Sequence, residues 1–73
     1  MPFISERLKA LRASEGLSQK AVADAIHIDE RNYRRYENGE TDPSVTNAAM
    51  IADYFGVSID YLVGRTDKPE INR

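Results

Sequence analysis

Residues 17–38 contain two short helix-forming patterns that are separated by only a few residues. The first pattern starts at Ser18, a residue type that caps helices well, and its apolar residues recur at the spacing of one helix face. The second starts at Asp29, another good cap, and stops at Gly39, where a helix commonly ends. Two helices joined by so short a turn form a helix-turn-helix, so this segment constrains the fold more than any other.

Three further helical patterns flank this unit, and no stretch alternates apolar and polar residues as a strand would. A helix is expected over about residues 4–15, before the unit. A fourth is expected to begin near Ser44 and a fifth at Ser58, with Ile59 and Leu62 of the fifth buried and Tyr61 as a weaker candidate for burial. The sequence therefore predicts an all-α, compact domain of five helices, the second and third of which form the helix-turn-helix.

The length of 73 residues suits one domain. We expect that domain to span residues 1–64, followed by a short flexible tail over residues 65–73, where apolar residues are few. Because the chain has no cysteine, disulfides and thiolate metal sites are excluded, which fits the reducing cytoplasm. The sequence shows neither a transmembrane segment nor a signal peptide, so no contact with a membrane is expected.

The net charge of −2 argues mildly against nucleic acid as a partner, but the positive charge is concentrated. Residues 1–39 carry a net charge of +1, and residues 40–73 carry −3. Three arginines lie within five positions of the second pattern, at Arg31, Arg34 and Arg35. Since phosphate binding depends on the local potential, a slightly acidic domain can still present a basic face.

The third helix, over about residues 29–38, is expected to separate an apolar face from a polar one. Tyr33 and Tyr36 are three positions apart and are expected to face the core. Arginine matches guanine or phosphate, asparagine pairs with adenine, and glutamate accepts from cytosine. After a tight turn, such a helix is expected to enter the major groove of double-stranded DNA. The residues on its outer face are Glu30, Arg31, Arg34, Arg35 and Asn38.

The chain resembles the helix-turn-helix regulators of the Cro and phage-repressor type, also called the xenobiotic-response-element family. The resemblance covers about residues 5–64 and implies a five-helix domain that binds operator DNA, usually as a dimer. It rests on four motifs that stand in the family's order and at its spacing: RLKALR at 7–12, GLSQKAVADAI at 16–26, NYRRYENGETDPS at 32–44 and IADYFGVSIDYLVG at 51–64.

The resemblance also implies roles for single residues. Gln19 matches a glutamine that contacts a phosphate at the start of the second helix, where free N–H groups favour an anion. Asn38 matches a phosphate contact that follows the recognition helix. Positions that match base-reading residues, or that lie beside them in the case of Arg34, are Glu30, Arg31, Arg34 and Arg35.

Glu37 stands in the last turn of the third helix, where the helix dipole disfavours an acid, so a cationic partner is expected. Members of the family similarly pair an arginine at the position of Arg12 with a glutamate at the position of Glu37. We expect a structural ion pair that ties the first helix to the third and sets the angle of the recognition helix. Removing one partner of such a pair strongly destabilises the folded state, because the other charge is left without a partner.

His27 departs from the family pattern, which usually has glycine in this turn. The position often needs a left-handed backbone, which histidine adopts more readily than most residues, so a somewhat strained turn is expected. As His27 is the sole histidine and no cysteine accompanies it, a metal ligand or pH sensor is the weaker interpretation. No catalytic group, cofactor motif or small-molecule site is evident, so we do not expect an enzyme.

These features predict a sequence-specific, DNA-binding regulator of transcription, most simply a repressor of phage or mobile-element type. The alternative is a protein-interaction module with the same fold, such as an antirepressor or antitoxin subunit, which has no need of Gln19 and the arginines. A homodimer is expected, because one recognition helix reads only about half an operator. The residues expected around the dimer contact are Phe55, Ile59, Tyr61, Leu62, Val63 and Ile71. Tyr61 and Val63 are preferred because they lie off the core stripe, and the alternative for Phe55, Ile59 and Leu62 is that they only complete the core of one copy.

Overall fold

Each helix after the first begins at the residue that the sequence offers as its cap. The computed structural model describes residues 2–71. The hydroxyl oxygens of Ser18, Ser44 and Ser58 each accept a hydrogen bond of 3.0–3.1 Å from the backbone N–H three residues later. Asp29 accepts from the second and third N–H groups that follow it. These bonds satisfy N–H groups that the start of a helix leaves unpaired.

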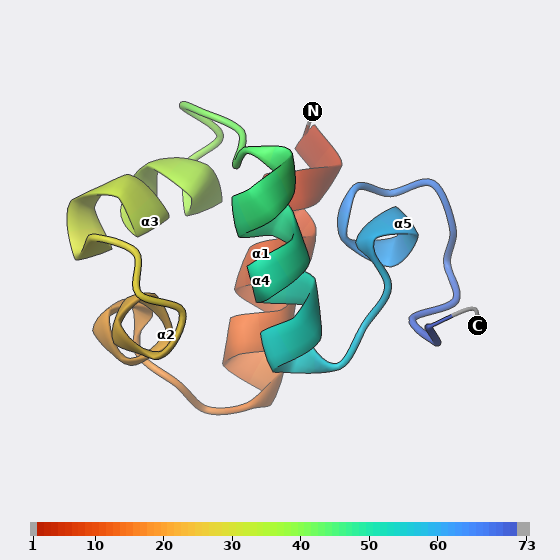
Figure 1. The fold of residues 1–73 in the computed structure, drawn as a ribbon, viewed down its shortest axis with the longest axis horizontal. Coiled ribbons are helices and arrows are strands. Elements are labelled where there is room, and N and C mark those ends of the chain that lie inside the picture. Colours follow the sequence, from red (N-terminus) through yellow and green to blue (C-terminus); the bar gives the residue numbers. More distant parts are fainter. Residues whose placement is uncertain (1, 72–73) are drawn as a thin grey trace.

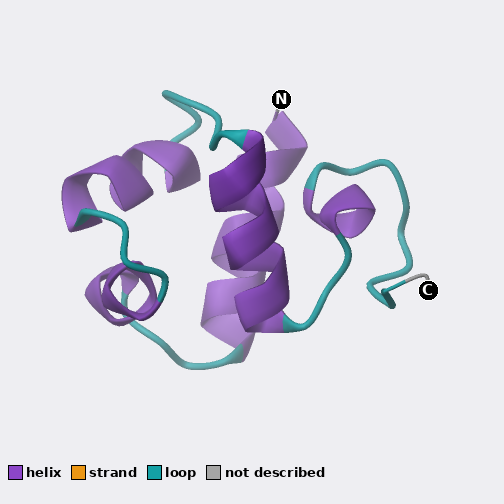
Figure 2. Ribbon diagram, in the orientation of Figure 1, coloured by secondary structure: helices purple, strands orange, loops and turns teal. Residues whose placement is uncertain are grey.

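The structure confirms the predicted all-helical fold of five helices within the described residues (Figure 1). Figure 2 shows that loops and turns make up the rest, and residues 2–71 contain no strand. No helix in this part of the chain is long and apolar enough to cross a membrane. The helices are α1 (Pro2–Ser14), α2 (Gln19–Ala25), α3 (Glu30–Glu37), α4 (Val45–Phe55) and α5 (Ile59–Leu62).

The arrangement places the helix-turn-helix at one end of the molecule. α3 packs against both α1 and α2, whereas α5 packs against α1 and α4. In the view of Figure 1, α2 and α3 therefore lie on one side of α1 and α4, and α5 lies with the C-terminal segment on the other side. The two ends can present different surfaces because the long helices separate them.

One hydrophobic core receives side chains from all five helices. Leu8 of α1, Tyr33 of α3 and Leu62 of α5 are completely buried. As the helical spacing predicted, Tyr33 and Tyr36 both face inward, so the polar residues between them face outward. The other members of the core are Val22, Ala23, Ile26, Ala48, Ile51, Ala52 and Val57.

The expected burial in α5 is wrong at one position. Ile59 was expected in the core but is 41% exposed, while Leu62 of the same helix is completely buried. Tyr61, for which the sequence left both burial and a place off the core stripe open, is half-buried and packs against the core. The guanidinium carbon of Arg7 lies 4.0 Å from the centre of its ring. A helix of only four residues is positioned by such contacts more than by its own periodicity.

Residues 65–73 were expected to form a loose tail, and in the described part of this segment Thr66, Asp67 and Pro69 form hydrogen bonds to α1 and to the cap residue of α5. Arg7 of α1 donates through Nη1 to the carbonyl oxygens of Tyr61 at 2.7 Å and Thr66 at 2.9 Å, and through Nη2 to Oδ1 of Asp67 at 3.1 Å. A backbone hydrogen bond of 3.0 Å also joins the cap residue of α5 to the tail. The flexibility of the tail stays a prediction, while Arg7 contacts this segment through the carbonyl oxygen of Thr66 and the carboxylate of Asp67.

Candidate nucleic-acid interface

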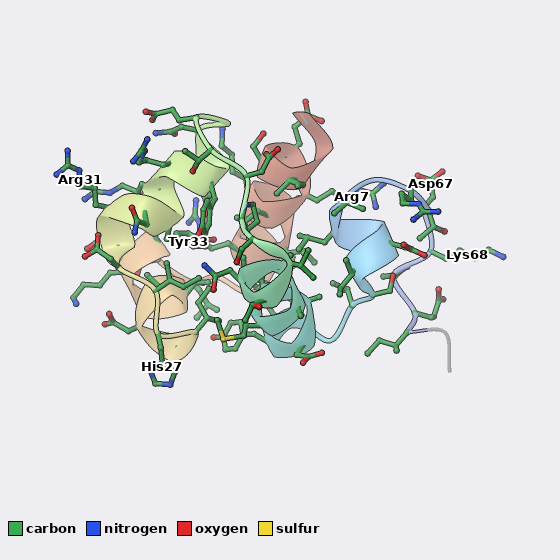
Figure 3. All side chains as sticks on the ribbon, turned by 45° about the horizontal axis from the view of Figure 1, so that its top comes forward. Arg7, His27, Arg31, Tyr33, Asp67 and Lys68 are labelled. Atoms are coloured by element: carbon green, nitrogen blue, oxygen red, sulfur yellow. The ribbon has the colours of Figure 1, made fainter. Side chains whose placement is uncertain are left out.

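The turn between α2 and α3 depends on one residue with a left-handed backbone. α2 ends at Ala25 and α3 begins at Glu30. Between them His27 has a φ of 57°, as the sequence predicted, and its exposed side chain lies at the edge of the molecule (Figure 3). The N–H of Ile28 then donates to the carbonyl oxygen of Ala23 at 2.9 Å. The turn thus closes back onto α2, at a conformational cost of about 1–2 kcal/mol for a residue with a side chain.

A buried carboxylate connects α3 to the two preceding helices. The side chain of Glu37 is 1% exposed. Arg12 of α1 donates to it twice, from Nε to Oε2 at 2.6 Å and from Nη2 to Oε1 at 3.0 Å. Gln19 of α2 donates from Nε2 to Oε1 at 3.1 Å, and the hydroxyl of Tyr33 donates to Oε2. We call these four residues the Glu37 cluster; their hydrogen bonds fill the accepting capacity of the carboxylate.

The Glu37 cluster favours the ionised form of Glu37. Burial acts to raise the pKa of Glu37, but hydrogen bonds from Arg12, Tyr33 and Gln19, together with the charge of Arg12, outweigh it and lower that pKa. Burial, and then the hydrogen bond to Glu37, raises the pKa of the Tyr33 hydroxyl. The hydrogen bond to Glu37 raises the pKa of Arg12. At neutral pH, therefore, Glu37 is a carboxylate and its three partners are donors.

The outer face of α3 carries the three arginines. Arg31, Arg34 and Arg35 are exposed, and Figure 3 shows Arg31 pointing away from the body of the molecule while Tyr33 points into it. Nη2 of Arg34 lies 4.0 Å from Oε2 of Glu30, one helical turn earlier. Within residues 2–71, neither Arg31 nor Arg35 forms an ion pair. Among the described residues, therefore, no carboxylate pairs with Arg31 or Arg35, whereas the charge of Arg34 is partly neutralised by Glu30.

The two residues expected at phosphates both lie near the C-terminal end of α3. Gln19, the first residue of α2, is half-buried and reaches Glu37 in the last turn of α3. Asn38 follows that turn directly and is exposed, with Nδ2 donating to Oε2 of Glu40 at 3.3 Å. Gly39 then turns the chain away from the helix with a φ of 75°. The structure thus brings together residues that are far apart in the sequence.

Several of these contacts were not predicted. Tyr33 and Glu37 stand four positions apart on one helix, so they share a face, and this contact had a signal in the sequence. The contact between Gln19 and Glu37 joins residues 18 positions apart, and that between Arg7 and Tyr61 joins residues 54 positions apart. Neither of these has a local pattern that would have predicted it.

Comparison with known proteins identifies relatives of this arrangement. The model of a protein family described as helix-turn-helix matches residues 8–62. The chain is similar to the SPbeta prophage-derived HTH-type transcriptional regulator YonR of Bacillus subtilis, with 38% identity over 64 residues, covering 88% of this chain and 59% of that protein. It is also similar to the cryptic phage CTXphi transcriptional repressor RstR of Vibrio cholerae, with 42% identity over 62 residues, covering 85% of this chain and 55% of that protein.

A solved structure has the same fold. The crystal structure of a transcriptional regulator from Listeria innocua superimposes with a TM-score of 0.78 at 34% sequence identity. The match covers 84% of this chain and 57% of that one. The chain thus spans a little over half the length of each of these three relatives.

Proposed function

The chain belongs to the helix-turn-helix family of transcriptional regulators of the Cro and phage-repressor type, and on this premise we propose that it binds double-stranded operator DNA. α3 enters the major groove as the recognition helix. The observation that carries this proposal is the outer face of α3, where Arg31 and Arg35 stand exposed and form no ion pair with any of the residues 2–71. The opposite face is held in the core by Tyr33 and Tyr36, which leaves the arginines on a rigid support.

The residues of this surface divide into two kinds of contact. Arg31 and Arg35 read guanine, because a guanidinium donates two parallel hydrogen bonds to O6 and N7. Arg34 and Glu30 act together; since their charges nearly cancel, they contribute to base selection more than to general affinity. Phosphate contacts, which position the protein without reading sequence, come from Gln19 and Asn38.

A selection from random DNA identifies the preferred operator, and substitution of single arginines then tests the proposal. Arg31→Ala and Arg35→Ala are each expected to weaken operator binding by about 1–3 kcal/mol and to relax the base preference at one position. The matched control is Arg65→Ala, because Arg65 is also exposed but lies after α5 and near Asp60 at 3.8 Å. It should leave operator affinity nearly unchanged.

Two results would contradict this assignment. Equal losses on operator and random duplex would make Arg31 and Arg35 phosphate contacts and not base readers. If the unsubstituted protein bound no duplex at low salt, DNA binding itself would be refuted, and the fold would serve as a protein-interaction module.

Repression in the cytoplasm is the regulatory outcome that we propose. Two relatives support it, since one is named as a transcriptional repressor of a cryptic phage and another as a prophage-derived regulator. A reporter gene behind the selected operator should be silenced by the chain, and Arg31→Ala should restore its expression. Activation of the reporter would contradict repression while leaving DNA binding intact.

We propose a homodimer on a palindromic operator, whose contact surface centres on two of the residues expected from the sequence, Ile59 and Ile71, in place of Tyr61 and Val63. Leu62 is completely buried within one copy, so it is not available to a second. Ile59 and Ile71 are 41% and 43% exposed and line one groove with Val57, which makes them the better candidates. Ile59→Ser should abolish cooperative binding to a palindrome, whereas Tyr54→Ser, a similarly exposed position outside that groove, should preserve it.

A further inference from the structure

Gln19 belongs both to the proposed DNA-facing surface and to the buried Glu37 cluster. Its side chain is half-buried, and one of its N–H bonds points inward to Oε1 of Glu37 at 3.1 Å. A primary amide carries two N–H groups, so a second donor remains after this bond is made. Gln19 can therefore bridge two anions, the buried carboxylate and a phosphate outside, and each would fix the orientation of the amide for the other.

The charge of Glu37 does not oppose such a bridge. Arg12 makes a two-pronged ion pair with the carboxylate, at 2.6 Å and 3.0 Å, so the cluster as a whole is close to neutral. The amide of Gln19 is itself uncharged. A phosphate that approaches Gln19 consequently meets a donor that is already oriented and no net negative charge behind it.

The position of the carboxylate depends in turn on Tyr33. Oε2 accepts from the Tyr33 hydroxyl and from Nε of Arg12, while Oε1 accepts from Nη2 of Arg12 and from Gln19. Because the hydroxyl of Tyr33 holds Oε2, it helps to set the rotation of the carboxylate and keeps Oε1 turned toward α2. Tyr33 thus affects the orientation of Gln19 through the carboxylate of Glu37, which accepts a hydrogen bond from each of them.

We propose that Glu37, steadied by the Tyr33 hydroxyl, is the positioning residue that orients the Gln19 amide for a DNA phosphate. This inference rests on the proposed DNA binding and deepens it. The buried cluster links the phosphate contact on α2 to the placement of α3, so the two parts of the interface are oriented by one carboxylate. Pre-orientation favours binding because less side-chain freedom is lost when the phosphate arrives.

The test is a double-mutant cycle on DNA affinity, with a random-sequence duplex at low salt as the probe, since a phosphate contact does not depend on sequence. Tyr33→Phe is expected to weaken binding by about threefold when Gln19 is present, as is typical for residues that share one network. In the Gln19→Ala background the same substitution should leave affinity unchanged, because no amide remains to be oriented.

Tyr36→Phe provides the matched control. It removes a hydroxyl from the same helix, but this hydroxyl accepts from Nδ2 of Asn47 at 3.0 Å and lies outside the Glu37 cluster. Its effect should be the same in both Gln19 backgrounds. If Tyr33→Phe also weakened binding equally in both, Tyr33 would have only a structural role and the proposal would be overturned. If the unsubstituted protein bound no duplex, the proposed function would fail, and the positioning role with it.

Nuclear magnetic resonance of the Gln19 side-chain amide provides a second test, the first part of which uses the protein without DNA. In the free protein, the proton directed at Glu37 should exchange with water at least several times more slowly than that of an exposed glutamine. Tyr33→Phe should reduce this protection, and Tyr36→Phe should not. When duplex is added to the unsubstituted protein, the other proton should show the larger change in chemical shift. Exchange as fast as that of an exposed glutamine for both protons would overturn the proposal.

Discussion

Replacing Glu37 with glutamine tests how far the buried carboxylate stabilises the fold. Both side chains have nearly the same size, so the change removes a charge and turns one accepting oxygen into a donating NH2 group. That group would face an N–H of Arg12 wherever it is placed, because Arg12 donates to each oxygen and has no acceptor. Its other neighbour, Tyr33 at Oε2 or Gln19 at Oε1, would have to change from donor to acceptor. The substitution therefore creates a conflict between donors at a position that is 1% exposed.

The size of the effect follows from the burial of the two partners. Removing one partner of a fully buried ion pair costs about 3–5 kcal/mol. The side chain of Arg12 is 23% exposed, so water can still reach part of the guanidinium, and this reduces the expected loss. We expect Glu37→Gln to lower the free energy of unfolding by about 2–3 kcal/mol. For a domain of this size that corresponds to a decrease in Tm of about 10–20 °C.

Thermal and urea unfolding, followed by circular dichroism at pH 7, measure this loss. Glu40→Gln is the control, because it makes the same change at an exposed position three residues later and should alter stability by less than about 0.5 kcal/mol. A double-mutant cycle with Arg12→Met should give a coupling energy above about 0.5 kcal/mol. If Glu37→Gln were as stable as the unsubstituted protein, or if the two changes were additive, the Glu37 cluster would not hold the recognition helix.

Three further predictions concern acid stability, the turn and the tail. Because folding lowers the pKa of Glu37, the unfolded chain binds that proton more readily, and the stabilisation present at neutral pH is lost as the pH falls below the ordinary value of 4.5. Acid titration of stability should therefore show a steeper loss for the unsubstituted protein than for Glu37→Gln, and parallel curves would contradict this. His27→Gly should raise the free energy of unfolding by between zero and about 1 kcal/mol, since glycine adopts a φ of 57° without strain; a clear loss would mean that the imidazole makes a stabilising contact. Arg7→Met should lower the free energy of unfolding by about 1–3 kcal/mol and speed tryptic cleavage after Arg65, because it removes three hydrogen bonds that hold α5 and the tail. Unchanged cleavage would show that the tail is held by other contacts.

The elements of this fold were predictable because their determinants are local. A cap such as Asp29 bonds to N–H groups only two and three residues away, and the inward face of Tyr33 and Tyr36 follows from the helical repeat. The left-handed turn at His27 was expected from the family resemblance, because the family usually has glycine at that position and histidine adopts this backbone more readily than most residues. These local features were sufficient to predict the five helices and the helix-turn-helix.

Other features required the tertiary structure, because they depend on side chains from distant segments meeting in one place. Tyr61 is half-buried because Arg7, 54 positions away, covers its ring, and the same arginine draws the tail onto α5. Gln19 was expected to contact a DNA phosphate, and only packing showed that its amide also lies 3.1 Å from a buried carboxylate. The sequence by itself determined which face of α3 is free to bind, because the helical repeat places the two tyrosines on one face and the arginines on the other. The packing of α1 and α2 against α3 decided what holds that face in position, since a hydrogen bond between helices exists only once all of them are docked.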